Sequence, residues 1–393
     1  MSVPRLILAI ESSCDESAVA LVRADGTVLS ERVATQAVLH ATTGGVIPEV
    51  AARAHHAWLP RLLSEVLDDA TTIGVEGQIG AVAVTAGPGL LGSLLVGAGV
   101  ASGWAWGRGL PIVPTNHLEG HLRAAWLRPA VPQAVRTEHL DGVQRTDATP
   151  LEGPTLPAIG LVVSGGHTLL VRIDRHGAIE RLGGTVDDAA GEAFDKIARL
   201  IGLPYPGGAA LSALAATGDA SPNGNGNRLP IARTEHPFDF SFSGVKTAAV
   251  RMALTAIGAD PSSPGRADAL ATLLVERPIP RGAAREIAVA AERAIVGALV
   301  ERVERALDAT PGAALIVGGG VAANVVLRRT LEDAARRRGR AITIPPIAWC
   351  TDNAAMIGAA AHAALAEGRA ELHDPGIGVP VSASWQIGAK APQ

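Results

Sequence analysis

Short apolar runs alternate along this chain with longer amphipathic stretches, and one arrangement of them occurs twice. Residues 5–26 hold an apolar run, a small polar turn, a second apolar run and then Asp-Gly. Residues 157–177 repeat that order about 150 residues later. Each segment predicts a β-hairpin, and runs this continuous are typical of strands buried on both faces. The Ser and Gly residues at the tips can offer backbone N–H groups to an anion.

Helices and strands are predicted to alternate after each hairpin. The first hairpin precedes predicted helices at 44–70 and 90–107 and predicted strands at 79–87 and 111–116. The second precedes predicted helices at 187–203, 284–307 and 322–339 and predicted strands at 313–320 and 341–346. Both halves are therefore α/β, which predicts a duplicated fold of two lobes with a cleft between them.

Three segments depart from this pattern. Residues 129–156 are rich in Pro, Thr, Asp and Glu, which predicts a linker or insertion between lobes at 1–128 and 157–349. Pro and Arg are frequent in residues 258–282, which are predicted to be an insertion between helices. Residues 386–393 are predicted to form a frayed tail.

Composition narrows the class of protein. The chain has 393 residues, 48% of them hydrophobic, which is enough for two or three domains with large cores. The net charge of −4 gives no overall attraction to nucleic acid or membrane. Cys14 and Cys350 are too few for a disulfide framework, so a reducing, cytoplasmic setting fits. Glycines interrupt the apolar residues 90–107, which favours a buried helix over a membrane span.

The stretch Asn116–His121, NHLEGH, contains a pair of histidines with metal-ligand spacing. His117 and His121 are four residues apart, so a helix would present both imidazoles on one face. Glu119 would lie roughly 200° around the helix from His117, at about 100° per residue, and would point away from a metal. The peptidase pattern H-E-x-x-H instead places its glutamate directly after the first histidine. Spacing alone leaves a metal pair and two ordinary helix residues equally open.

A third ligand would have to come from elsewhere in the chain. Asp352 precedes a predicted helix of small residues, where it would cap the helix or lie in its first turn. Aimed into the cleft, it would complete a set of two histidines and one aspartate. That set recurs at iron and zinc sites with open coordination positions.

Glycine-rich turns provide candidate binding sites for a nucleotide. Gly318, Gly319 and Gly320 lie between a predicted strand and helix, and Asn324 in the first helical turn could bond a ribose or base. A tight turn of the protein itself is the alternative. The spacing fits neither a Rossmann fingerprint nor a P-loop. The basic run 328–341 is expected to be a solvated helix face or a contact with RNA phosphates.

Nine motifs in order resemble the TsaD family, the tRNA N6-adenosine threonylcarbamoyltransferases. They are ESSCDES, GGVIPEVAARAH, TAGPGLLGSLLVGA, NHLEGHL, VSGGHT, DDAAGEAFDKIARLIGLPYPGG, FSFSGVKTA, GGGVAAN and CTDNAAMIG. The resemblance implies the α/β actin/Hsp70/sugar-kinase (ASKHA) fold, with the C-terminal helix at about 350–370 completing the first lobe. It also implies transfer of the threonylcarbamoyl group of L-threonylcarbamoyladenylate to N6 of adenosine 37, with release of AMP, in tRNAs reading codons that begin with A.

The resemblance also assigns residues, a cofactor and partners. It implies one divalent metal, iron(II) or alternatively zinc, on His117, His121 and Asp352. Substrate contacts are implied for Val162, Val163, Ser164, Gly165, Gly166, Asp195, Gly208 and Asn324. The expected partners are tRNA and the TsaB and TsaE proteins, while TsaC makes the adenylate. An ATP-dependent small-molecule kinase of the same fold and a metallopeptidase are the alternatives.

Overall fold

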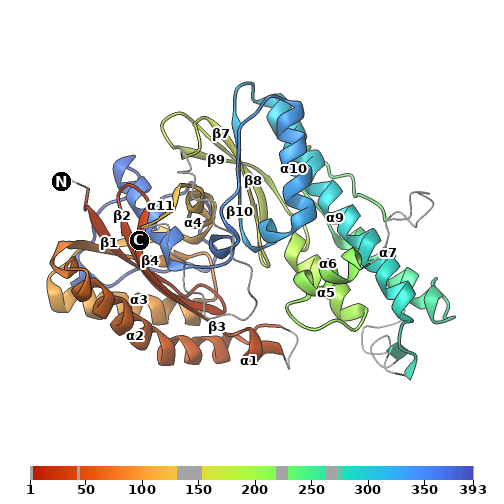
Figure 1. Ribbon diagram of the computed structural model, residues 1–393, viewed down its shortest axis with the longest axis horizontal. Helices are drawn as coiled ribbons and strands as arrows, with labels where there is room; N and C mark the ends of the chain where they lie inside the picture. The colour runs from red at the N-terminus through yellow and green to blue at the C-terminus, as the bar shows by residue number, and fades with distance from the viewer. Residues whose placement is uncertain are drawn as a thin grey trace.

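The computed structural model describes residues 3–41, 45–130, 153–217, 229–262, 273–274 and 276–392. The part outside the described residues is 131–152 of the predicted 129–156 segment, and 263–272 with 275 of the predicted 258–282 segment. Two β-sheets form the centre of the molecule, and helices cover the outer face of each (Figure 1). Within the described segments, no helix is both long and apolar enough to cross a membrane.

The two sheets repeat one topology. The first has the order β5-β4-β1-β2-β3-β6 and the second the order β11-β10-β7-β8-β9. In each, the hairpin strands pair antiparallel and the first hairpin strand pairs parallel with the next strand to follow a helix. The duplicated α/β fold predicted from the repeated hairpins is confirmed. The strands of the first sheet are β1 (Leu6–Glu11), β2 (Glu16–Arg23), β3 (Thr27–Thr35), β4 (Ile79–Gly87), β5 (Ile112–Asn116) and β6 (Arg128–Pro129). Those of the second are β7 (Ala158–Val163), β8 (Thr168–Ile173), β9 (Ile179–Gly184), β10 (Ala314–Gly318) and β11 (Ile342–Thr343).

Helices bury both faces of each sheet, which explains the continuous apolar runs. Along β1, Leu8 packs with α2 and α3 on one face, whereas Ala9 packs with α11 on the other. Along β7, Leu161 packs toward α5 and α9, whereas Val162 packs toward α4. Successive strand residues point to opposite faces, so every position of such a strand must be apolar. The helices are α1 (Ala37–Ala41), α2 (Pro48–Thr72), α3 (Leu91–Arg108), α4 (His117–Arg123), α5 (Ala190–Leu200), α6 (Gly207–Ala216), α7 (Ser243–Ala256), α9 (Arg281–Ala309), α10 (Val325–Arg337) and α11 (Ala354–Ala366).

Helix α4 lies between the two sheets (Figure 1). It follows β5 directly and contacts β4 and β5 of the first sheet and β7 and β10 of the second. Helix α11, from the end of the chain, packs on β1, β2 and β5 and against α4. The residues at the start of α11 are thus brought next to α4 although they are far apart in sequence.

The C-terminal segment departs from its prediction as a frayed tail. Ile387 is 7% exposed and packs in the same cluster as Leu118 and Leu122 of α4. The amide of Asn116 donates to the carbonyl of Trp385 at 3.3 Å, and the Trp385 indole donates to the carbonyl of Ala389 at 3.1 Å. The segment is therefore ordered, because Ile387 is buried and these hydrogen bonds attach it to the rest of the protein.

Candidate metal centre and substrate site

Helix α4 presents both histidines to the same side. Asn116 caps the helix, because its side-chain oxygen accepts from the backbone N–H of Leu118 at 3.0 Å and of Glu119 at 3.2 Å. His117 is therefore the first helical residue, and His121 lies one turn later. Their ring centroids are 4.7 Å apart with an interplanar angle of 74°.

The structure brings Asp352 to these two histidines. Its Oδ1 lies 3.2 Å from His121 Nε2 and 3.6 Å from His117 Nε2. The candidate ligand atoms of the three residues all lie within 4.8 Å of one another. Asp352 was expected to cap or begin its helix, but Asn353 is the cap, with its side-chain oxygen accepting from Met356 N at 2.8 Å. The Asp352 carboxylate is thereby left free to face the imidazoles.

His121 shows that these residues suit a cation. The side chain is fully buried, and among the residues that the structure describes neither ring nitrogen makes a well-formed hydrogen bond, since Nε2 has only the ion-pair contact with Asp352 Oδ1 at 3.2 Å. Buried polar atoms are nearly always satisfied, so such an atom needs an explanation. Two imidazoles and a carboxylate are ligands that iron and zinc accept. The three residues therefore fit a divalent transition metal.

Charge supports the same interpretation. Burial by itself would raise the pKa of Asp352, but the two imidazoles hold it below the usual range of a carboxylate. Burial would lower the pKa of His117, but Asp352 and Glu11 raise it to about 9. The site thus concentrates negative charge around imidazoles, and a metal binding there would displace a proton from His117.

Glu11 orients His117, a role that the sequence did not reveal. Its Oε2 lies 3.1 Å from His117 Nδ1 and also accepts from Thr85 Oγ1 at 2.6 Å. Ser13 Oγ lies 3.1 Å from the same ring nitrogen. A carboxylate on one ring nitrogen directs the other toward the metal in many metal sites. The signal available in the sequence was a charged residue at the end of a fully apolar strand.

Glu119 is held away from the centre, as its position on the helix predicts. Its side chain is 6% exposed, and Oε2 pairs with Arg369 Nη1 at 2.8 Å. Arg369 also pairs with Glu367 at 2.6 Å, and Glu367 pairs with Arg123 at 2.5 Å. This network ties α4 to the residues that follow α11.

The second hairpin turn lies close to the centre. The backbone N–H of His167 donates to Ser164 Oγ at 3.2 Å, and Ser164 N donates to the His167 carbonyl at 2.8 Å. Burial lowers the pKa of His167 to about 4, with the His117 and His121 imidazoles adding to the shift. His167 is therefore a neutral imidazole beside the candidate ligands, and no pattern in the sequence indicated this position.

Residues 162–166 divide into buried and open positions. Val162 and Val163 are fully buried in β7, so their side chains belong to the core and only their backbone could meet a ligand. Gly165 and Gly166 are exposed, and a Cβ added at either would have no heavy atom within 4 Å. The turn thus has open space beside it.

The remaining predicted contacts lie on three different helices or their caps. Gly208 N, in α6, donates to Asp195 Oδ1, in α5, at 3.0 Å. Asn324 caps α10 and does not lie within its first turn. Its side-chain oxygen accepts from Leu327 N, and its amide donates to Ser212 Oγ and Glu292 Oε1, each at 2.8 Å. Asn324 therefore already uses its oxygen and both amide protons within the protein.

The triple-glycine turn allows close contact between protein backbones. A Cβ on Gly318 would lie 2.1 Å from the His121 carbonyl oxygen, and one on Gly319 would lie 2.4 Å from the Val163 carbonyl oxygen. Gly319 also has a φ of +98°, which L-residues rarely adopt. The tight-turn alternative accounts for these two glycines. A Cβ added at Gly320 would lie 3.9 Å from Thr351 Cγ2, with no other heavy atom of the described residues within 4 Å.

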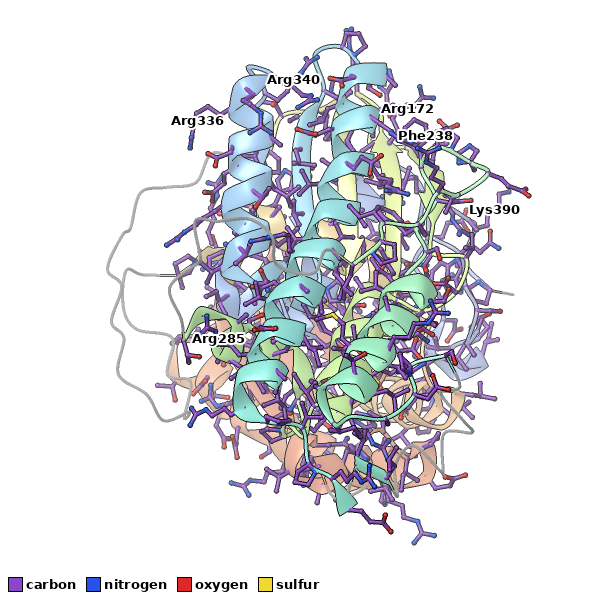
Figure 2. All side chains as sticks on the ribbon, turned by 90° about the vertical axis from the view of Figure 1, so that its right-hand side faces the viewer. Arg172, Phe238, Arg285, Arg336, Arg340 and Lys390 are labelled. Atoms are coloured by element: carbon purple, nitrogen blue, oxygen red, sulfur yellow. The ribbon has the colours of Figure 1, made fainter. Side chains whose placement is uncertain are left out.

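The basic run of α10 is largely paired with acidic residues. Arg337 and Arg338 both contact Glu304 of α9, at 2.8 and 2.7 Å, and Arg338 also contacts Asp308 at 2.7 Å. Arg336 lies with Arg340 at the C-terminal end of the helix (Figure 2). These pairs favour the solvated-face interpretation over a contact with RNA.

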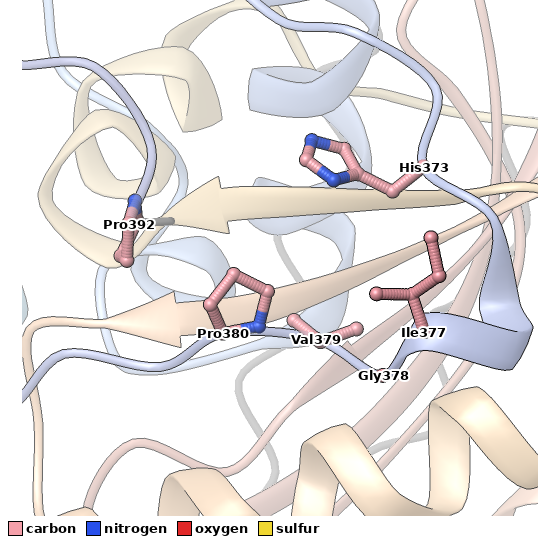
Figure 3. Close-up of a pocket in the computed structure, with 6 residues that line it drawn as sticks. All are labelled: His373, Ile377, Gly378, Val379, Pro380 and Pro392. Carbon is pink, nitrogen blue, oxygen red and sulfur yellow. The ribbon is translucent and has the colours of Figure 1, made fainter.

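One apolar pocket, of about 490 Å³, lies in the C-terminal segment (Figure 3). His373 in its wall bridges to Ile112 at the start of β5, whereas His117 follows the end of that strand. The pocket is therefore separate from the candidate metal centre. Its lining residues are His373, Ile377, Gly378, Val379, Pro380 and Pro392.

Comparison with known proteins identifies relatives across most of the chain. Residues 27–138 and 132–359 match the family model of TsaD, tRNA N6-adenosine threonylcarbamoyltransferase. A protein of that name from Sorangium cellulosum (strain So ce56) is 42% identical over 371 residues, covering 94% of each chain. Another from Geobacter sp. (strain M21) is 42% identical over 352 residues, covering 90% of this chain and 89% of its own.

A solved structure supports the fold. The crystal structure of T. kodakarensis HypF matches 94% of this chain and 49% of its own, with a TM-score of 0.53 and 12% sequence identity. At that identity the likeness concerns the fold alone, and it agrees with the ASKHA architecture expected from the motifs. With the family model matched over most of its length, this chain belongs to the TsaD family of tRNA N6-adenosine threonylcarbamoyltransferases.

Proposed function

We propose that this enzyme carries out its family's transfer at the centre formed by His117, His121 and Asp352. The threonylcarbamoyl group of L-threonylcarbamoyladenylate passes to N6 of adenosine 37 in tRNAs reading codons that begin with A. A bond forms between N6 and the carbamoyl carbon, the bond from that carbon to the phosphate oxygen breaks, AMP leaves and one proton leaves N6. The observation that carries this proposal is the convergence of the three side chains, whose candidate ligand atoms all lie within 4.8 Å of one another.

The donor set favours iron(II), with zinc as the alternative. When bound, a divalent metal at this centre supplies Lewis-acid polarisation of the threonylcarbamoyl carbonyl. The protein's part is to hold the three ligands, with Glu11 fixing the His117 ring. The open turn at Gly165 and Gly166 offers backbone N–H groups to the adenylate phosphate. Asp195, Gly208 and the backbone of Val162, Val163 and Ser164 are the further substrate contacts proposed here. Asn324 would join them by exchanging its hydrogen bond to Ser212 or Glu292 for one to the substrate.

Neither cysteine supports a covalent intermediate. Burial and the neighbouring Asp15 raise the pKa of Cys14 far above the ordinary thiol value. Burial also raises the pKa of Cys350. Both side chains are therefore thiols near neutral pH, whereas a nucleophilic cysteine requires the thiolate. We therefore infer that N6 attacks the adenylate directly, with no cysteine intermediate.

The metallopeptidase alternative lacks its base, because Glu119 is paired with Arg369 on another side of α4. The kinase alternative shares the fold but gives no reason for the two histidines and aspartate to converge.

We further propose that this enzyme binds tRNA in the cytoplasm, and that TsaB and TsaE are needed for tight binding. The net charge of −4 and the acid-paired arginines of α10 leave the isolated chain little affinity for phosphates. Its tRNA binding should therefore be weak and should fall further as salt rises. Tight binding that resists salt would contradict this partner requirement.

The test reconstitutes the reaction with the purified chain, TsaB, TsaE, metal, tRNA and threonylcarbamoyladenylate. Nucleoside mass spectrometry should show one modified adenosine for each AMP released. A tRNA with guanosine at position 37 is the matched control and should remain unmodified. If a TsaD relative forms the product under these conditions and this chain does not, the proposed activity is wrong.

A further inference from the structure

A carboxylate from the N-terminal half reaches the segment that carries Asp352. Glu31, on β3, accepts from the backbone N–H of Ala355 at 2.9 Å through Oε1. Its Oε2 accepts from the Trp349 indole N–H at 3.2 Å. These donors lie three residues after and three residues before Asp352. One side chain therefore binds both flanks of the third candidate ligand.

Besides Glu31, this segment is bonded from within itself and by Arg328 of α10, which donates to Cys350 Sγ at 3.0 Å. Asn353 accepts from Met356 N and donates to the Thr351 carbonyl, each at 2.8 Å, so it shapes the turn from within. The bonds of Glu31 join the turn to the first sheet, across 318 and 324 positions of sequence. His117 and His121 depend on the same sheet, since α4 follows directly from β5.

We propose that Glu31 is a positioning residue for the metal centre, holding Asp352 at bonding distance from a metal on His117 and His121. The inference rests on the proposed function, because it requires that these three residues bind metal. Groups that fix a ligand's position affect metal affinity even though they never touch the metal. Loss of the Glu31 carboxylate should therefore lower metal affinity although all three proposed ligands remain.

The surroundings of Glu31 provide a readout that depends on pH. Burial raises the pKa of Glu31 to about 6, while the Ala355 N–H and the Trp349 indole oppose the shift. Its neighbour Arg32 pairs instead with Asp69 at 2.8 Å and with Glu65 at 3.5 Å, both on α2. The carboxylate is thus the form that accepts both hydrogen bonds, and this form is lost as the pH falls through about 6.

The experiment titrates the metal-free full-length chain with Co²⁺, whose visible absorption reports its coordination. Glu31→Gln keeps the size of the side chain but replaces one acceptor with a donor. Its Kd for Co²⁺ should rise on the order of tenfold at pH 7.5.

A matched control removes the charge of a different carboxylate. Like Glu31, this carboxylate accepts a hydrogen bond from a backbone N–H at the start of a helix to which it does not belong. Asp187 accepts from Phe242 N, at the start of α7, at 2.8 Å. Asp187→Asn should leave the Kd for Co²⁺ unchanged. If it weakens binding as much as Glu31→Gln does, general loss of stability explains both results and the inference is wrong.

The pH profile separates positioning from a loss of packing. The ratio of the two Kd values, variant over wild type, should shrink toward one below about pH 6, because wild-type Glu31 is then protonated. Titration of the histidines is common to both proteins and cancels in the ratio. A ratio that stays constant with pH would overturn the inference.

The outcomes also distinguish this inference from the proposed function. Wild-type protein that binds no Co²⁺, Fe²⁺ or Zn²⁺ would overturn the metal centre and the inference together. Wild-type binding with an equal Kd for Glu31→Gln would overturn the role of Glu31 alone. If Glu31→Gln does not fold, Trp349→Phe removes one of the two donors and should weaken Co²⁺ binding several-fold. An unchanged Kd in that variant would also overturn the inference.

Discussion

The turns after β1 and β7 occupy equivalent places in the two repeated sheets, but they are built differently. The last residue of β1 is Glu11, which is fully buried and bound to His117, and Ser13 beside it is also buried. The last residue of β7 is Val163, which packs in an apolar core, and Gly165 beyond it is exposed. The first turn is filled with polar side chains, and the second is left open.

This difference indicates that the two repeats have different roles. A duplicated backbone brings two similar turns toward one centre, and the side chains decide what each turn does. The first turn supports His117, a proposed metal ligand, through hydrogen bonds. The second leaves space in which backbone N–H groups can meet a substrate. If this is correct, substitutions in the first repeat should change metal affinity, and those in the second should change substrate binding.

The largest expected effect on metal affinity comes from a ligand itself. His121→Ala should lower metal affinity by more than about 100-fold, because ligand loss exceeds the effect of losing a supporting group. The transfer rate should fall with it. Metal content by mass spectrometry and formation of modified adenosine measure the two effects. If the folded variant keeps both metal and activity, the histidine pair is structural.

Glu11→Gln should have the next largest effect. The substitution removes the charge that orients His117 Nδ1, so metal affinity should fall about 10- to 100-fold. It also removes one of the two carboxylates that raise the pKa of His117. In the wild type, metal must displace the proton of His117, so affinity should rise with pH up to about 9. In the variant, metal affinity should stop rising at a lower pH. If metal affinity depends on pH as it does in the wild type, Glu11 does not act on His117.

Glu119→Gln should affect stability more than the metal. The substitution weakens the buried pair with Arg369, which should cost roughly 1 to 3 kcal/mol of unfolding free energy. Because the carboxylate does not face the ligands, metal affinity should change by less than about threefold. Denaturant unfolding and metal titration measure these effects separately. Loss of metal from the folded variant would place Glu119 in the centre after all.

The smallest effect on metal is expected in the second turn. Gly165→Val should fold, because the added side chain enters open space and the backbone at this position has no positive φ. The valine would occupy that space, so KM for the adenylate should rise on the order of tenfold while metal affinity stays unchanged. Steady-state kinetics beside a metal titration tests this. If the variant has an altered metal affinity and an unchanged KM, the proposed difference between the two turns is wrong.

Local patterns in the sequence were enough to predict several features. The continuous apolar runs predicted strands buried on both faces, because each strand residue must meet one covering layer or the other. The four-residue spacing of His117 and His121 predicted a shared helix face, and the same periodicity predicted that Glu119 points elsewhere. These inferences needed only backbone geometry.

Other features depended on contacts that no local pattern contains. The glycines at 318 and 319 are explained by the approach of the His121 and Val163 carbonyl groups, which belong to distant elements. Residues 386–393 were expected to form a frayed tail, yet Ile387 is buried against α4. In both cases the packing partner determined the outcome.

The sequence by itself determined the duplicated α/β fold and placed two imidazoles on one helix, because both follow from the periodicity of strands and helices. The sequence also offered Asp352 as a possible third ligand, and the family resemblance implied that role for it. The tertiary structure decided that the Asp352 carboxylate lies 3.2 Å from His121 Nε2, that Glu11 lies 3.1 Å from His117 Nδ1 and that Glu31 accepts from Ala355 N. The physical reason is that these contacts arise where sheet pairing and the packing of α11 bring together residues more than a hundred positions apart.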